Sequence, residues 1–298
     1  MDDRPGPRGR RRRGVMIGVA VAAALAVALL AFNTGGHYSG LTVPRLEPEA
    51  LAESLRPYYR IARPPGDGPF PVALLFSGCD GPRDNLDRWA AALRDRGWAT
   101  MIVDSHAPRG LDVGEAWRLV CAGQVLMGSE RAGDILVAMD DARKLPFADP
   151  GRLLLVGASH GGWSIMDLLA LDPPAALPYN LARLPAAAPA DPLAGLAGTI
   201  LLYPYCGPAN LARRAGWRRP VPVLMILAGE DRVAPPGACR SIAETLAARG
   251  LPVTSTTLPG VDHGFDQSER SALSPLDYDP AATAEAIALA GGFLDELP

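Results

Sequence analysis

The sequence predicts an α/β fold in which a mainly parallel sheet is covered by helices on both faces. Short apolar runs bounded by turn residues alternate along the chain with longer segments whose apolar residues recur at helical spacing. Continuous apolar runs are typical of strands that are buried on both faces. A charge-free apolar stretch behind a run of arginines also predicts one transmembrane helix ahead of this domain.

The amino-terminal segment has the features of a membrane anchor. Residues 15–32 are eighteen residues without a charged side chain, nearly all Ala, Val, Leu, Ile or Met. This length just crosses a bilayer as a helix. Five arginines between positions 8 and 13 precede it, and the positive-inside rule keeps them cytoplasmic. We expect a single-pass protein of the cell membrane with its domain outside the cytoplasm. A cleaved signal peptide, including a twin-arginine signal, is the alternative and would give a secreted or periplasmic protein.

Composition divides the chain into three parts and excludes one class of partner. We expect a basic tail and anchor over residues 1–33, a Gly-, Pro- and polar-rich linker over 34–56, and the α/β domain over 57–298. The formal net charge is −3, although residues 1–33 carry six arginines against two aspartates. The rest of the chain is therefore mildly acidic, which argues against nucleic-acid binding.

The elements of the domain follow from its apolar patterns. Leu86, Trp89, Ala90 and Leu93 share one face of a helix that Gly97 ends. Residues 172–197 are rich in Pro and Ala and are expected to be irregular. The expected strands are 58–62 (at an edge), 71–76, 98–103, 153–156, 199–203, 221–228 and 253–258. The expected helices are a short one near 48–55, then 85–96, one within 120–144, 163–170, 237–249 and 280–297.

The stretch Gly157-Ala158-Ser159-His160-Gly161-Gly162 stands between an expected strand and an expected helix. A serine at such a turn is the layout of a nucleophile elbow. Its backbone is strained, and side chains at the flanking positions would clash with the neighbouring strand and helix, which explains the glycines. We therefore predict that Ser159 is a nucleophile.

A serine hydroxyl needs a base, and the base needs an acid to orient it. His263 follows the last expected strand, in Asp262-His263-Gly264-Phe265, and is the best of four histidines. His37 lies in the expected linker, His106 in an early loop, and the ring of His160 points away from its neighbour Ser159. Asp231 is the predicted acid, with Glu230 as its rival. Because ligands of parallel sheets bind beyond the carboxyl ends of the strands, we expect Ser159, Asp231 and His263 to meet there.

An acyl-transfer site also needs hydrogen-bond donors for the oxyanion. The backbone N–H of His160, directly after the nucleophile, is one predicted donor. The second is the backbone N–H of Cys79, in the Ser77-Gly78-Cys79-Asp80-Gly81 turn after the strand at 71–76.

These motifs together resemble the dienelactone hydrolase family of the α/β-hydrolase superfamily, over roughly residues 57–297. The turn at 77–81 looks like the family's His-Gly-Cys-Gly-Gly turn, and the order Ser, Asp, His is that of α/β-hydrolases. The other shared motifs are Val103-Asp104-Ser105…Pro108-Arg109-Gly110 followed by Cys121, the elbow, Gly229-Glu230-Asp231 and the motif around His263. The family's namesake enzymes use a cysteine nucleophile where this chain has Ser159, and a histidine where it has Ser77. These departures favour a general serine esterase.

Four cysteines follow the apolar segment and allow three pairings. Cys79 and Cys121 lie in connections that leave early strands, and Cys206 and Cys239 follow neighbouring strands. We predict the disulfides Cys79–Cys121 and Cys206–Cys239, which suit an oxidising compartment. The cysteines are too scattered for a zinc site, the histidines do not cluster, and no nucleotide-binding glycine loop follows the first strand, so we expect no metal and no cofactor.

The leading hypothesis is a serine hydrolase that cleaves a small-molecule ester or lactone through an acyl-enzyme. A catalytically silent α/β-hydrolase domain used for binding at the cell envelope is the alternative from another class. A small serine peptidase is a further alternative.

Overall fold

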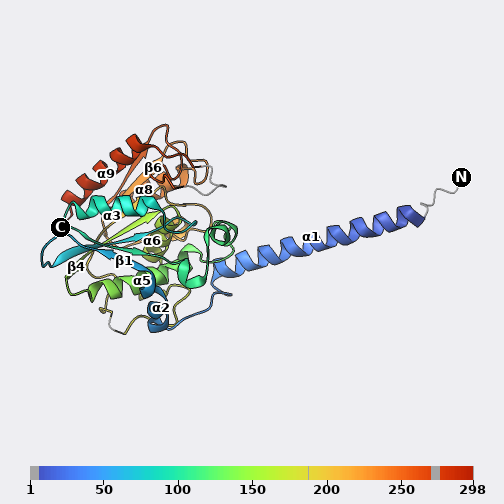
Figure 1. Ribbon diagram of the computed structural model, residues 1–298, viewed down its shortest axis with the longest axis horizontal. Coiled ribbons are helices and arrows are strands. Elements are labelled where there is room, and N and C mark those ends of the chain that lie inside the picture. The colour runs from blue at the N-terminus through green and yellow to red at the C-terminus, as the bar shows by residue number, and fades with distance from the viewer. Residues whose placement is uncertain (1–6, 187, 270–275, 298) are drawn as a thin grey trace.

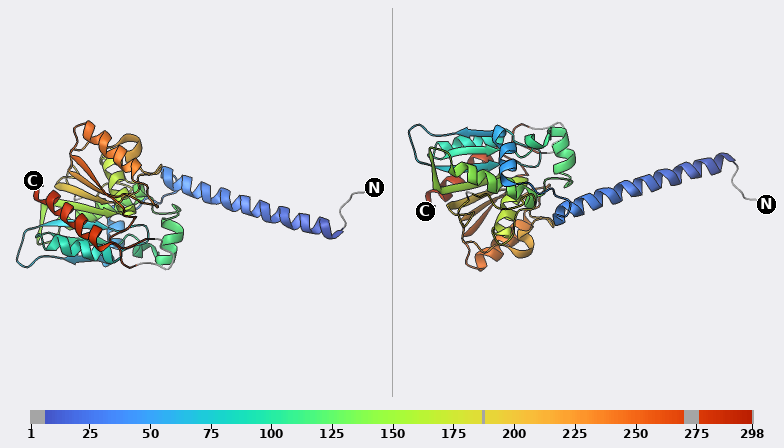
Figure 2. Two further views of the ribbon diagram at one scale, coloured as in Figure 1. Left: turned by 90° about the horizontal axis from the view of Figure 1, so that it is seen from above. Right: turned by 90° about the horizontal axis from the view of Figure 1, so that it is seen from below.

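The computed structural model describes residues 7–186, 188–269 and 276–297, with side chains from Gly14 onward, so the side chains of the basic run at 8–13 lie outside the described part. A compact α/β body carries one long helix that projects away from it (Figures 1 and 2). The predicted α/β-hydrolase fold with one apolar helix at the amino terminus is confirmed.

A seven-stranded sheet forms the centre of the body, in the order β1-β3-β2-β4-β5-β6-β7. The edge strand β1 pairs antiparallel with β3, and the other neighbouring pairs are parallel. The strands are β1 Tyr59–Ala62, β2 Phe70–Phe76, β3 Ala99–Val103, β4 Ala148–Ala158, β5 Leu196–Leu202, β6 Val223–Ala228 and β7 Val253–Leu258.

Helices cover both faces of this sheet, as expected. Apolar side chains of α3 and α9 pack on one face, and those of α2, α5, α6 and α8 pack on the other. Figure 1 shows α3 and α9 on one side of the sheet and α2 and α5 on the other. The helices are α1 Pro7–Ser39, α2 Pro48–Leu55, α3 Asp84–Arg94, α4 Val113–Glu115, α5 Gly128–Arg143, α6 His160–Leu171, α7 Ala212–Ala215, α8 Gly237–Ala248 and α9 Pro280–Asp295. Short turns of other helical types are Arg56–Tyr58, Ala107–Arg109 and Ala116–Val120.

The inner strands β2, β3, β5 and β6 are apolar on both faces because each face has its own layer of helices. In β2, Val72, Leu74 and Phe76 belong to the core under α5, while Ala73 and Leu75 belong to the core under α3. All five side chains are fully buried. This burial explains why the strand reads as a continuous apolar run.

The helix expected within residues 120–144 begins later than its periodicity indicates. Residues 116–120 form a π-helical turn, and α5 starts only at Gly128. Gly123 and Leu126 between them have positive φ values of 64° and 56°, which an α-helix does not accept. The apolar residues before position 128 therefore line a loop.

The segment expected as a linker also differs from a free connection. Helix α1 continues past the apolar stretch to Ser39, and Leu51, Ala52 and Leu55 of α2 are buried in the core. Asn33 and His37 lie one helical turn apart and both contact the body, which explains why the helix continues there.

Candidate active site

The turn between β4 and α6 holds Ser159 in the strained backbone of an elbow, with φ 50° and ψ −110°. A side chain at Gly157 would place its Cβ 2.5 Å from the backbone of Gly161. A side chain at Gly161 would overlap the carbonyl oxygen of Phe76. Backbone atoms on both sides thus require glycine at these positions.

The structure brings Ser159, His263 and Asp231 together at the carboxyl end of the sheet. The Oγ of Ser159 lies 2.8 Å from Nε2 of His263, and Nδ1 of that ring lies 2.6 Å from Oδ2 of Asp231. The other oxygen of Asp231 accepts hydrogen bonds from the backbone N–H groups of Val233 and Ala234. These bonds fix the carboxylate, so the ring is oriented from one side and meets the hydroxyl on the other.

Glu230 and Asp262, the acidic residues next to Asp231 and His263 in the sequence, do not take part in these hydrogen bonds. Glu230, the rival of Asp231, is exposed to solvent. Asp262 accepts hydrogen bonds from the backbone N–H groups of Arg232 and His263 and pairs with the Arg232 guanidinium. Asp262 therefore holds the backbone of the loop that carries His263.

The turn after β2 lies directly beside Ser159. A Cβ built on Gly78 would be 3.8 Å from the Cβ of Ser159, and Cys79 and Ser159 line the same cavities. His160 begins α6, where the first N–H groups of a helix have no partner within it. Cys79 and His160, whose backbone N–H groups are the predicted oxyanion donors, therefore both lie beside Ser159.

His106, which the sequence offers only as a loop histidine, braces this turn. Its Nε2 lies 3.0 Å from the carbonyl oxygen of Cys79. Burial lowers the pKa of the ring to about 3, with the Arg131 guanidinium adding to the effect, so the ring is neutral and its N–H donates to Cys79. The one sequence signal for this role is that His106 closely follows a strand.

Replacing His106 with glutamine should flatten the acid limb of the stability curve. The ordinary pKa of the ring is 6.5 and its folded value is about 3, so between these values the unfolded chain binds one more proton. The free energy of unfolding therefore falls as the pH falls through this window, by about 1.4 kcal/mol per pH unit for one such ring. We expect the slope between about pH 4 and 6 to be less steep by this amount in His106→Gln, as measured by urea unfolding.

The ring of His160 is also buried and its pKa lies well below the ordinary value, but it is present in both proteins and its contribution cancels. Equal slopes for wild type and variant would contradict a neutral, buried His106.

Arg131 of α5 lies behind both flanking donors, and sequence reading did not find it. Its guanidinium donates to the carbonyl and hydroxyl oxygens of Ser77 at 2.8 and 3.1 Å and to the hydroxyl of Ser105 at 3.1 Å. It also lies 3.2 Å from Nδ1 of His160. Burial lowers its pKa to about 10, which leaves it cationic near neutral pH. A buried positive charge therefore touches the residues that precede Gly78 and follow Ser159.

Tyr203, at the end of β5, supports the other side of the histidine. Its ring makes an edge contact with His263 at 4.8 Å between centroids. Its hydroxyl bonds to the buried carboxylate of Asp266, which also accepts the indole N–H of Trp89 at 2.7 Å. Burial raises the pKa of Asp266. Tyr203 thus limits the movement of the His263 ring.

Two cavities meet at Ser159. One has a volume of about 190 Å³ and extends past Trp117 and Leu276. The other, of about 310 Å³, extends past Met127, Trp163 and Thr34. An ester bound with its carbonyl at Ser159 would place its two halves in these two spaces.

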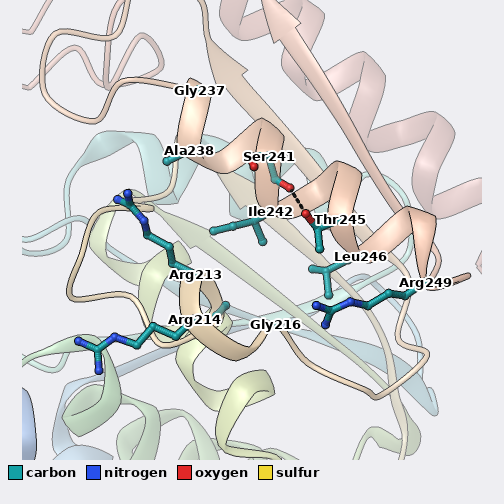
Figure 3. A pocket seen from close by; sticks show the side chains of 11 residues that line it. Arg213, Arg214, Gly216, Gly237, Ala238, Ser241, Ile242, Thr245, Leu246 and Arg249 are labelled. Atoms are coloured by element: carbon teal, nitrogen blue, oxygen red, sulfur yellow. Dashed lines mark hydrogen bonds between the residues drawn. The ribbon is translucent and has the colours of Figure 1, made fainter.

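A separate cavity of about 420 Å³ lies between α7 and α8 (Figure 3). It is bordered by Arg213, Arg214 and Arg249 and shares no lining residue with the two cavities at Ser159. No histidine is among its lining residues, so Ser241 and Thr245 in its wall have no histidine base there.

Two disulfides, Cys79–Cys121 and Cys206–Cys239, are present in the structure. The first joins the turn beside Ser159 to the segment before α5, and the second joins the connection after β5 to α8. Among the described residues, no group of three or more His, Cys, Asp or Glu side chains is arranged to hold a metal ion.

Curated relatives match a limited part of the chain. Dipeptidyl-peptidase 5 of Porphyromonas gingivalis is 29% identical over 102 residues, and the same enzyme of Porphyromonas endodontalis is 28% identical over 102 residues. These matches include 32% of this chain and span only 14% of either relative.

Solved structures with the same fold cover most of the chain. A putative dienelactone hydrolase from Klebsiella pneumoniae has a TM-score of 0.60 at 16% identity, over 80% of this chain and 92% of that one. Esterase 2 of Thermogutta terrifontis, phosphonylated by sarin, has a TM-score of 0.57 at 17% identity, over 80% of this chain and 89% of that one. The propionate-bound form of that esterase has a TM-score of 0.56 at 18% identity, over 80% of this chain and 88% of that one.

The pattern of the Dienelactone hydrolase family matches residues 59–297, which is most of the chain and includes the whole sheet. The predicted family is therefore confirmed. The chain belongs to the dienelactone hydrolase family, a family of hydrolases with the α/β-hydrolase fold.

Proposed function

We propose that this hydrolase cleaves small-molecule carboxylic esters or lactones with Ser159 as its nucleophile. The observation that carries the proposal is the unbroken hydrogen-bond path from Asp231 through His263 to Ser159, with distances of 2.6 and 2.8 Å. Strain at Ser159 and the neighbouring N–H groups support it, because a nucleophile elbow beside oxyanion donors suits acyl transfer.

The reaction follows from these contacts. His263 takes the proton of the Ser159 hydroxyl while the oxygen attacks the carbonyl carbon, and the backbone N–H groups of Cys79 and His160 hold the oxyanion. His263 then gives that proton to the departing alkoxide, which leaves the acyl group on Ser159. Water then attacks the acyl-enzyme while His263 takes its proton. The carboxylic acid product is released, and His263 returns the proton to Ser159. Asp231 keeps the ring in one tautomer and stabilises its charged form.

We also propose that the domain works outside the cytoplasm and that α1 remains attached as an anchor. Helix α1 includes one long apolar span near the amino terminus, Gly14–Ser39. Its residues from 14 to 32 are exposed in the structure and need an apolar environment. Two disulfides favour an oxidising compartment. Mass analysis of the purified protein's amino terminus distinguishes an anchor from a cleaved signal.

A fluorophosphonate probe tests the nucleophile directly. We expect stoichiometric labelling of the native protein, with the label on the peptide that contains Ser159, because an activated serine attacks phosphorus as it attacks a carbonyl. The heat-denatured protein should remain unlabelled, since denaturation separates Ser159 from His263. Phosphonylation of the Thermogutta esterase by sarin supports the choice of probe. Absence of labelling, or a label on another residue, would favour a silent binding domain instead.

A serine peptidase is the second candidate, because the local similarity to dipeptidyl-peptidase 5 is to a peptidase. Dipeptidyl p-nitroanilides and p-nitrophenyl butyrate separate the two activities. We expect a much higher kcat/KM for the ester, and the opposite order would favour the peptidase.

A further inference from the structure

Helix α1 reaches the body at the edge of the sheet where the candidate active site lies. Figures 1 and 2 show it leaving on the side opposite the carboxyl terminus, next to the segment that follows β3. The carboxyl ends of six parallel strands open on this side, and Ser159 follows one of them. A helix attached at the opposite edge would turn the site away from any membrane that it crosses.

Specific contacts hold the end of α1 in this place. Asn33 donates to the carbonyl oxygen of Gln124 at 2.6 Å, and the Gln124 side chain donates to the hydroxyl of Thr34 at 2.7 Å. His37 and Glu130 are both buried and lie 3.1 Å apart. One turn of helix therefore carries three contacts to the loop before α5 and to its first turn, which fixes the direction in which α1 leaves the body.

Another face of the end of α1 contacts α7 and the segment before it. The Cζ of Arg214 lies 4.6 Å from the centroid of the Tyr38 ring, and the Tyr38 hydroxyl donates to the carbonyl oxygen of Pro208. The end of α1 is thus held between the loop before α5 and the segment that leads into α7.

The same helix end forms part of the wall of the site. Thr34 lines the cavity of about 310 Å³ that also contains Ser159. Val120, Met127 and Trp163 make much of the remaining wall apolar. Thr34 lies two residues after Phe32, the last residue of the apolar stretch, which corresponds to about 3 Å along a helix. The cavity therefore begins within one helical turn of the end of the apolar stretch.

Exposed apolar side chains lie close to the junction of α1 with the body. Leu41, two residues after the end of α1, is 86% exposed, and Val233, which lines both cavities at Ser159, is 52% exposed. Large apolar side chains beside the end of an anchor helix suit the boundary between lipid headgroups and acyl chains.

We propose that the substrate is an amphiphilic ester of the membrane in which α1 is anchored, and that its hydrocarbon chain enters the cavity beside Thr34. The proposal rests on the function proposed above and adds the source and the polarity of the substrate. The docked end of α1 holds the mouth of the site at the membrane surface, so an ester at headgroup level reaches Ser159 while its chain leaves the bilayer along an apolar wall. The body is then a positioned enzyme, in contrast to one that is merely tethered.

A flexible insertion tests whether α1 must hold the body in a fixed direction or need only attach it to the membrane. Twelve Gly and Ser residues placed between Phe32 and Asn33 keep the anchor and every docked contact of residues 33–39, but they free the body from the direction of α1. The matched control carries the same twelve residues ahead of Met1. Each full-length protein is reconstituted into phosphatidylcholine–phosphatidylglycerol vesicles. Two activities are measured, on soluble p-nitrophenyl butyrate and on 4-methylumbelliferyl oleate held in the vesicles.

We expect all three proteins to cleave the soluble ester at the same rate. The insertion variant should cleave the oleate ester at least fivefold more slowly than the wild type and the control. Equal oleate rates in all three proteins would overturn the proposal and leave the hydrolase function intact, as would a wild type that cleaves only the soluble ester. A wild type that cleaves neither ester would overturn the proposed function, and this inference with it.

Discussion

Ser159→Ala should lower kcat/KM for p-nitrophenyl butyrate by about 10⁴- to 10⁶-fold, because the variant has no atom that can attack the carbonyl. His263→Ala should cause a loss of similar size, since the Ser159 hydroxyl, 2.8 Å from the ring, then has no base. Residues that act as one unit are not additive, so the double variant should be no worse than either single one. Stopped-flow and steady-state release of p-nitrophenol measure these effects.

Asp231 and Glu230, which are adjacent in the sequence, provide a matched pair of variants that tests which carboxylate orients His263. Asp231→Asn should cost several orders of magnitude, because the amide favours the wrong tautomer of His263. Glu230→Gln should leave the rate within about twofold of wild type, because Glu230 is exposed and surface changes away from the site have small effects. A large loss in Glu230→Gln with a small loss in Asp231→Asn would reverse the assignment of the acid.

Arg131→Met should lower the free energy of unfolding by about 3 kcal/mol, because it removes the partner of three buried oxygens. These oxygens are the carbonyl and hydroxyl of Ser77 and the hydroxyl of Ser105. Methionine fills part of the space but offers no hydrogen-bond donor. Chemical denaturation monitored by tryptophan fluorescence measures the change.

Arg131→Lys keeps the charge and part of the bonding, so its loss of stability should be smaller than that of Arg131→Met. The kcat of the methionine variant should also fall by at least about tenfold, since the turn that carries the Cys79 N–H is then held less firmly. A methionine variant as stable and as active as wild type would show that Arg131 supports neither the turn nor the fold.

The sequence predicts the inner strands well because β2, β3, β5 and β6 are buried on both faces and therefore appear as apolar runs between turn residues. The residues proposed for catalysis could be named for a related reason. Ser159, Asp231 and His263 each follow a strand within five residues, and the carboxyl ends of parallel strands lie at one edge. Their closeness in space is thus a consequence of topology.

The supporting residues could not be found in this way. Arg131 lies within a helix and acts through contacts to residues 26 to 54 positions away. His106 bonds to a carbonyl oxygen 27 residues earlier. No local pattern encodes such contacts. The end of α1 was missed because its glycines and polar residues read as a loop, although Asn33 and His37 form a docking face once the body is present.

The Cys79–Cys121 bond has a practical consequence for work with this protein. It closes a loop across 42 positions, and a cross-link of that length contributes on the order of 4 kcal/mol by restricting the unfolded chain. A chain made in a reducing host lacks this cross-link, and the turn beside Ser159 is then held by the hydrogen bonds from Arg131 and His106 without the covalent bond. Recombinant material should therefore be produced by export or in an oxidising strain. An inactive preparation should be assayed for free thiols before the active site is held responsible.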